Sequence, residues 1–173
     1  MRFTAISGAA ALLVLSVSTS LMAQRPDDQI DPKSLALLQE GRAARAAGNL
    51  DGAEDALESA LAVDPRNREA FVVLAEVARS RSLPGKAIRF YGEALALEPN
   101  DLAALRGQGE ALVAKGAIEK AKANLAKINT ICKTGCNDAN ILAATIAKGP
   151  PPTTTAQAVP AAQTPADKPA EPN

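Results

Sequence analysis

Apolar residues recur at helical spacing through the middle of the chain, in stretches that turn-forming residues separate. In the first stretch, leucines and alanines between residues 35 and 47 alternate with Gln, Glu and Arg until Gly48-Asn49 breaks the pattern. A second helix is predicted from about Asp51 to Val63, because its alanines and leucines share one face and Pro65 follows. The pattern therefore predicts two helices joined by a tight turn.

This helix-turn-helix unit recurs from Arg68 to Glu98 and from Leu102 to Ile131, at a spacing of 34 residues. The positions that align are Gly41, Ala75 and Gly109; Leu37, Phe71 and Leu105; Ala53, Ala87 and Ala121; Leu57, Tyr91 and Leu125; and Ala60, Ala94 and Ile128. Pro65 and Pro99 close the first two units. A small residue, a large apolar residue four before it, and an Ala-x3-large-x2-small pattern that ends in Pro form the tetratricopeptide signature. The chain therefore resembles the tetratricopeptide repeat (TPR) family.

The fold class expected from this resemblance is an all-α TPR solenoid of three helix-turn-helix repeats plus a C-terminal capping helix. The small residues at positions such as Gly41 and Ala53 are expected where the first helix of a pair crosses the second, with Tyr91 in the core. Pro84 falls in the first turn of its helix, where a missing N–H is tolerated. The third unit has Lys133 where the others have Pro, and an amphipathic stretch follows it.

The two ends of the chain differ from the repeats. Arg2, an apolar run from Ala5 to Val17 and a small-residue site ending at Ala23 predict a secretory signal peptide, and the run is shorter than a membrane anchor needs. The Pro-, Ala- and Thr-rich C-terminal end is expected to be disordered. The expected organisation is a signal peptide (1–23), a linker (24–33), repeats (34–67, 68–101 and 102–135), a capping helix (137–148) and a Pro-rich tail (149–173).

The resemblance implies that the first helix of each pair lines a concave groove that binds a protein or peptide. The implied groove residues are Leu38, Arg42, Arg45, Glu69, Val72, Glu76, Arg79, Arg106 and Glu110. Two interpretations of these charges stay open. Either the arginines bind carboxylates of an extended or helical peptide, or arginines and glutamates form a solvated, self-compensating face.

One specialised function of the family is not expected here. Chaperone-binding TPR proteins hold a partner's terminal carboxylate with basic and Asn residues at fixed groove positions. The corresponding positions of this chain are Leu38, Arg42, Val73, Ala103 and Gly107, of which only Arg42 is basic.

Composition narrows the function further. The chain has no His, which removes the usual catalytic dyads, proton shuttle and imidazole metal ligand, so we expect no enzyme, metal or cofactor. Without residues 1–23, 18 basic residues face 19 acidic ones, and a nearly neutral chain with few aromatics is unsuited to nucleic acid. We expect no membrane insertion once the signal peptide is removed.

Cys132 and Cys136 are the only cysteines. Export to an oxidising compartment favours a disulfide between them, and Gly135 gives the intervening backbone freedom. The sequence therefore predicts a protein- or peptide-binding scaffold of the periplasm or cell envelope. The alternative is a thiol-disulfide redox protein using Cys132 and Cys136, whose C-x3-C spacing differs from the C-x-x-C of thioredoxin-type motifs.

Overall fold

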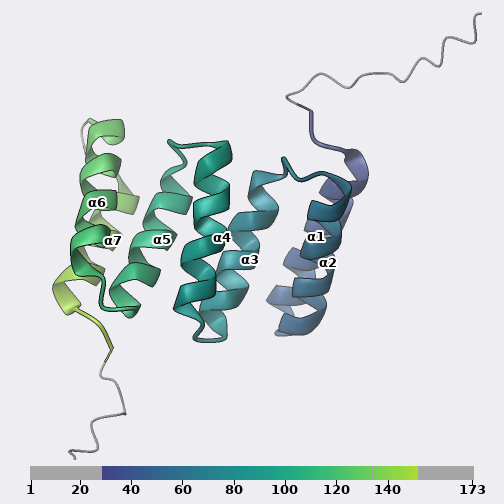
Figure 1. The fold of residues 1–173 in the computed structure, drawn as a ribbon, viewed down its shortest axis with the longest axis horizontal. Coiled ribbons are helices and arrows are strands. Elements are labelled where there is room, and N and C mark those ends of the chain that lie inside the picture. The colour runs from purple at the N-terminus through teal and green to yellow at the C-terminus, as the bar shows by residue number, and fades with distance from the viewer. Residues whose placement is uncertain (1–28, 134, 152–173) are drawn as a thin grey trace, which may run out of the picture.

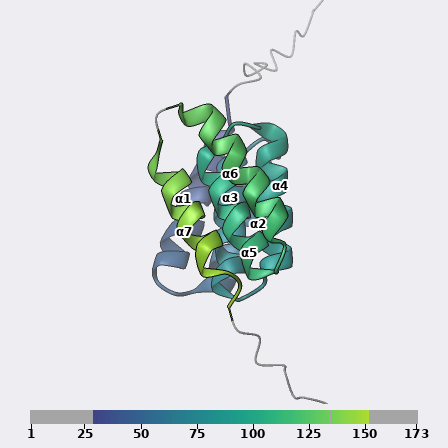
Figure 2. The same ribbon diagram turned by 90° about the vertical axis from the view of Figure 1, so that its left-hand side faces the viewer.

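The protein is an array of helices stacked in chain order. The computed structural model describes residues 29–133 and 135–151, so the predicted signal peptide and nearly all of the predicted tail lie outside the described residues. Figure 1 shows α1 and α2 at one end of the stack and α6 and α7 at the other, and Figure 2 looks along it from the α6–α7 end. The helices are α1 (Pro32–Ala46), α2 (Leu50–Val63), α3 (Arg68–Ser80), α4 (Pro84–Leu97), α5 (Leu102–Ala114), α6 (Ile118–Cys132) and α7 (Asn137–Lys148).

Short polar side chains fix where most of these helices begin. The carboxylate or amide oxygen of Asp31, Asn49, Asn67 and Asp101 accepts a hydrogen bond from a backbone N–H in the first turn of α1, α2, α3 and α5. These bonds satisfy donors that have no partner inside the helix. α4 has no such side-chain cap and begins instead with Pro84, which the sequence placed in the first turn.

Close contacts between helices occur where a side chain is small. A Cβ atom at Gly41 would lie 2.6 Å from Leu57 Cγ of α2, which is the crossing that the repeat pattern predicted. A Cβ atom at Gly109 would instead lie 2.6 Å from both methyl carbons of Leu142, on α7. The repeat pattern did not predict this contact of Gly109 with the capping helix. The capping helix lies against α5 and places a fully buried leucine on this glycine.

A polar contact joins neighbouring repeats at each of the first two junctions between repeats. Asn67 Nδ2 donates to Ser34 Oγ at 2.8 Å, and both residues are buried. Thirty-four residues later the same two positions are Arg68 and Asp101, and they form an ion pair. At the third junction the equivalent positions hold Leu and Gly. The Cys132–Cys136 pair lies at this junction, between α6 and α7.

Candidate functional site

Seven of the nine predicted groove residues form one surface on α1, α3 and α5. We call this surface the charged face; it consists of Arg42, Arg45, Glu69, Glu76, Arg79, Arg106 and Glu110. These residues come from the first helix of each pair because the 34-residue repeat presents the same helix surface in each unit. The structure thus brings together side chains that are far apart in sequence.

Leu38 and Val72 do not belong to this surface, which corrects the prediction for these two residues. Leu38 is 2% exposed and packs with Leu57 and Leu74. Val72 is 6% exposed and lies in a core cluster with Tyr91 and alanines of α3, α4 and α5. Each first helix contacts both its own partner and the next first helix, so it buries a wider stripe than a surface helix with one neighbour.

Ion pairs connect each first helix to the next. Arg42 pairs with Glu69 and Arg45 with Glu76, which joins α1 to α3. Arg79 Nη2 lies 2.5 Å from Glu110 Oε2, which joins α3 to α5. These pairs repeat at similar helix positions, so the charged face is a ladder of arginine–carboxylate contacts along the stack.

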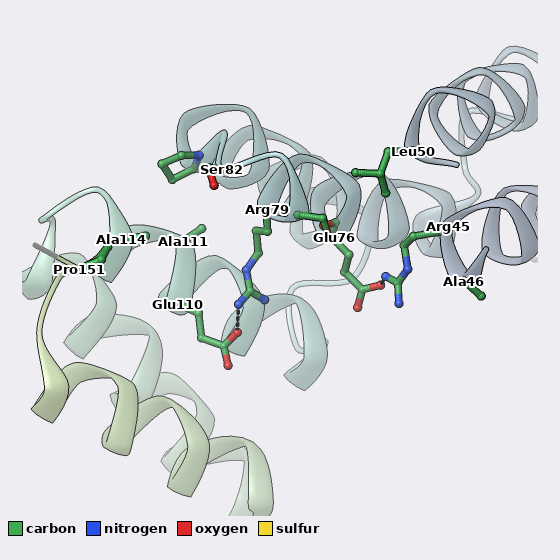
Figure 3. A pocket seen from close by; sticks show the side chains of 12 residues that line it. Arg45, Ala46, Leu50, Glu76, Arg79, Ser82, Glu110, Ala111, Ala114 and Pro151 are labelled. Carbon is green, nitrogen blue, oxygen red and sulfur yellow. Dashed lines mark hydrogen bonds and ion pairs between the residues drawn. The ribbon is translucent and has the colours of Figure 1, made fainter. Parts of the chain in front are cut away.

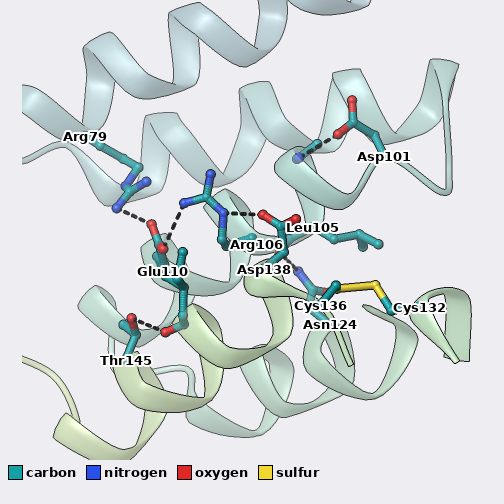
Figure 4. A network of polar contacts seen from close by, with 12 residues as sticks. Arg79, Asp101, Leu105, Arg106, Glu110, Asn124, Cys132, Cys136, Asp138 and Thr145 are labelled. Atoms are coloured by element: carbon teal, nitrogen blue, oxygen red, sulfur yellow. Dashed lines mark hydrogen bonds and ion pairs between the residues drawn. A yellow bond between two sulfur atoms is a disulfide. The ribbon is translucent and has the colours of Figure 1, made fainter. Parts of the chain in front are cut away.

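The ladder continues onto the capping helix through Arg106. Its Nε donates to Asp138 Oδ1 of α7 at 2.7 Å, and its Nη1 lies 3.3 Å from Glu110 Oε1 (Figure 4). Burial alone would lower the pKa of Arg106, but the hydrogen bonds and negative charges of Asp138 and Glu110 outweigh it and raise the pKa above its usual value. Arg106 therefore stays charged, and Glu110 accepts from two arginines.

These contacts compensate the charge of the face. Four arginines oppose Glu69, Glu76, Glu110 and, on α7, Asp138. The arginine side chains are 28–40% exposed, so each pair contributes no more than about 1 kcal/mol to stability. The face is polar and close to neutral rather than basic, which favours the self-compensating interpretation of its charges.

A cavity of about 790 Å³ opens at the C-terminal ends of α1, α3 and α5 (Figure 3). Four members of the ladder line it: Arg45, Glu76, Arg79 and Glu110. The other lining residues, which sequence reasoning missed, are small or apolar: Ala46, Leu50, Ser80, Ser82, Pro84, Ala111, Ala114 and Pro151. Arg42, Glu69 and Arg106 lie farther along the charged face and do not line the cavity.

Aligned small residues in the repeats could have indicated this cavity. Ala46, Ser80 and Ala114 align at 34-residue spacing, each as the last residue of a first helix. A small residue at this position leaves space between the turns of neighbouring repeats. Such a cavity, with a few charged groups and small apolar walls, has the chemistry of a ligand site and a volume typical of one.

The two cysteines lie apart from the cavity. Their sulfur atoms are joined at 2.16 Å, with the Cα atoms 5.8 Å apart, and both side chains pack beside Leu105, Ile128 and Leu142. No cluster of three or more potential metal ligands occurs within the described residues. Among the same residues, no helix has the length and hydrophobicity that a membrane span requires. The disulfide in the purified protein remains a prediction.

Comparison with known proteins shows which fold this structure resembles. Residues 38–92 match the family model described as tetratricopeptide repeat. The structure is similar to the first TPR of Spaghetti (RPAP3) bound to HSP90 peptide SRMEEVD, with 22% identity, 67% of this chain and 91% of that chain covered, and a TM-score of 0.62.

Two further TPR structures are similar at the same level. The Sgt2 TPR domain from Aspergillus fumigatus is 23% identical, with 78% of this chain and 95% of that chain covered and a TM-score of 0.62. The TPR2B domain of yeast Sti1, in complex with pHsp70, is 15% identical, with 68% of this chain and 98% of that chain covered and a TM-score of 0.63. A comparison with curated proteins finds no match. The predicted all-α TPR solenoid is confirmed.

Proposed function

We propose that this chain is a protein-binding scaffold that holds a peptide segment of a partner across the charged face and its cavity. The observation that carries the proposal is the cavity, because it collects side chains from three repeats into one concave site. Its walls offer guanidinium donors, carboxylate acceptors and small apolar patches. This combination suits the backbone and short side chains of a peptide.

The similar structures support a peptide ligand as a class. The first TPR of Spaghetti is bound to the HSP90 peptide SRMEEVD, and the second TPR of human RPAP3 is in complex with the HSP70 peptide SGPTIEEVD. The residues of this chain do not favour an acidic peptide of that kind. Of the positions that correspond to the carboxylate-holding ones, Leu38, Val73 and Gly107 are buried, and Arg42 already pairs with Glu69.

The paired charges of the ladder also indicate the net charge of the ligand. A strongly acidic segment would have to displace carboxylates such as Glu76 and Glu110 from their arginines, leaving those carboxylates without partners. The Glu110 side chain is only 9% exposed, so leaving this charge unpaired is costly. The face therefore suits a segment of low net charge, which can accept hydrogen bonds from guanidinium N–H groups that the ladder leaves available.

We place this activity in the periplasm or cell envelope. The support is the signal-peptide pattern of residues 1–23, which lies outside the described residues. The mature protein should begin at Gln24 and appear in the soluble periplasmic fraction. Intact-mass measurement and cell fractionation test this proposal, and retained Met1 or recovery with the inner membrane would contradict it.

The binding proposal is tested by filling the cavity. Ala46 and Ala114 are exposed lining residues, so the double variant Ala46→Trp with Ala114→Trp obstructs the cavity without placing bulk in the core. The matched control is Ala96→Trp, on an exposed position of α4 that does not line the cavity. Immobilised proteins should capture a partner from a periplasmic extract at least tenfold less well after obstruction. Equal capture by the double variant and the control, both with unchanged circular dichroism, would contradict the proposal.

The redox alternative has weaker support. Cys132 and Cys136 are joined at the α6–α7 junction, and neither lines the cavity. This position suits a structural link between the last repeat and the capping helix. A redox role requires that thioredoxin-like donors reduce the bond readily, and that Cys132→Ser with Cys136→Ser abolishes function while stability stays unchanged. Thiol titration of the unmodified protein after exposure to such donors, together with urea unfolding of the double variant, distinguishes the two roles.

A further inference from the structure

We infer that the cavity binds a segment of this same chain, residues 152–158, which directly follow the last described residue. This inference rests on the proposed function, because it names a ligand for the same cavity. A partner peptide would then have to displace the intramolecular segment. The evidence is the position of Pro151 and the reach and charge of the segment.

The chain leaves α7 toward the cavity. α7 ends at Lys148, and Gly149 adopts φ +73° with its N–H donating to Ile146 O at 3.1 Å, which turns the backbone away from the helix axis. Pro151 then lines the cavity. Figure 3 shows Pro151 on the side of Ala111 and Ala114, so the last described residue lies on the cavity wall.

Seven residues are enough to cross from this wall to the opposite one. Packed helices lie about 8–10 Å apart, so the path from α5 past α3 to α1 is about 20 Å. An extended, polyproline-like segment rises about 3.1 Å per residue. Residues 152–158 would therefore span the cavity from Ala114 to Ala46.

The segment matches the cavity in charge and size. Its sequence is Pro-Thr-Thr-Thr-Ala-Gln-Ala, without an ionisable side chain, and the charged residues of the tail, Asp167, Lys168 and Glu171, come later. The arginines and glutamates of the cavity already pair with one another, so an uncharged occupant leaves no charge without a partner. Threonine hydroxyls and backbone carbonyls can accept from the guanidinium groups, and the small side chains fit beside the lining alanines.

Ser82 adds a hydroxyl group to the cavity wall. It adopts φ +57°, whereas the residues at the equivalent repeat positions, Gly48 and Gly116, adopt φ +78° and +81°. Glycine takes this backbone conformation without strain, and a serine does not. Ser82 lines the cavity, so a strained position carries a hydroxyl at the proposed site.

Tethering makes this contact effective even if the segment binds weakly by itself. A short linker holds its ligand at an effective concentration in the millimolar range. A free partner peptide must compete against that concentration. The segment would therefore act as a built-in competitor that sets a threshold for partner binding.

Paramagnetic relaxation in the full chain tests the contact. A spin label is attached through Ala156→Cys, with mass spectrometry confirming one label per molecule, and backbone amide signals are recorded. The informative reporter is Leu50, because it lies on the wall opposite Pro151, beyond the tether's own attachment point. Its amide should broaden at least fivefold more than that of Glu93, an exposed residue that does not line the cavity.

Two variants and one control make the result specific. Obstruction by Ala46→Trp with Ala114→Trp should remove the extra broadening of Leu50, whereas Ala96→Trp should keep it. Thr153→Glu, Thr154→Glu and Thr155→Glu, which leave the helices untouched, should also remove it by placing carboxylates beside Glu76 and Glu110. Equal broadening of Leu50 and Glu93, or broadening that all of these variants retain, would overturn the inference.

The result is separable from that of the proposed function. If Leu50 does not broaden but obstruction still abolishes partner capture, the intramolecular ligand is wrong and the scaffold proposal stands. If Leu50 broadens and obstruction leaves capture unchanged, the segment binds the cavity and the partner binds elsewhere.

Discussion

Gly107 lies at a close contact between neighbouring repeats, and a single methyl group there should destabilise the stack. It is in the middle of α5, opposite Tyr91 of α4. A Cβ atom at Gly107 would lie 2.3 Å from Tyr91 Cζ and 2.4 Å from its hydroxyl oxygen. Ordinary contact requires about 1 Å more, so Gly107→Ala forces the ring or the helix to move.

The ring has little room to move. Tyr91 is 1% exposed and packs among Ala75, Ala87 and Ala94, which are all 0% exposed. Overpacking of a dense core costs about 1–3 kcal/mol, whereas replacing glycine by alanine inside a helix gains about 1 kcal/mol. Because the clash involves a rigid ring rather than a flexible chain end, the overpacking cost should lie at the upper end of this range. We therefore expect a net loss of about 2 kcal/mol in the free energy of unfolding.

The matched control is Gly92→Ala, in the interior of the neighbouring helix α4. There a Cβ atom would meet only Gln108 Nε2, at 3.7 Å, so the propensity gain of about 0.5–1 kcal/mol should appear undiminished. Urea unfolding followed by circular dichroism measures both variants. With a slope of about 1–3 kcal/mol per molar, the midpoint should fall by about 1 M for Gly107→Ala and rise for Gly92→Ala. Similar shifts for the two variants would refute the packing argument.

Other parts of the fold give three further predictions. The pKa of Asp64 is lowered from 3.8 to about 2, chiefly by its hydrogen bond from Arg66, so stability should fall as the pH drops from 4 toward 2. Urea unfolding should show that Asp64→Asn lowers the free energy of unfolding by up to about 2 kcal/mol at pH 7 and by little at pH 2. Glu110→Gln, which removes a charge shared by two arginines, should cost about 1–2 kcal/mol, whereas Glu58→Ala on an exposed position should stay within about 0.5. Titration of the purified protein should detect no free thiol. Because a disulfide that closes so short a loop contributes about 2 kcal/mol to stability, Cys132→Ser with Cys136→Ser should lower the melting temperature by a few degrees and speed amide exchange in α7.

Local features of the sequence were sufficient to predict the helices and much of the core. Helix periodicity, turn residues and Pro84 gave the element order, and the repeat alignment predicted the burial of Tyr91. These features act within one helix or between helices adjacent in the chain. They also placed a helix over the amphipathic stretch 137–148, which α7 occupies.

Contacts that depend on the end of the stack were not predictable in this way. Leu37 and Phe71 are only partly buried, whereas Leu105 at the equivalent position is buried in a cluster that contains Leu142 of α7. Gly109 contacts α7 because the array ends there and the capping helix replaces a fourth repeat. Repeat register alone assigns equivalent surroundings to equivalent positions, and that assumption fails at the ends.

The charged face shows a second limit of prediction from the sequence. Sequence reasoning placed its arginines and glutamates on one surface, but their pairing depends on side-chain conformations across helices. Partners such as Arg45 and Glu76 are about thirty residues apart, and Arg106 contacts two carboxylates, those of Glu110 and Asp138. Only the assembled stack determines that the ladder is compensated, and this compensation changes the expected ligand from acidic to nearly neutral.

Site-specific photo-cross-linking tests the central claim, that a peptide segment binds in the cavity. A photoreactive phenylalanine derivative replaces Ala46, Ala114 or, as the control outside the cavity, Ala96 in the full chain, and mass spectrometry maps the cross-linked peptides after irradiation in cells. The account predicts that positions 46 and 114 cross-link to the same segment, from a partner or from residues 152–158, and that position 96 does not. Equal yields at all three positions, or no cross-link at positions 46 and 114, would contradict it.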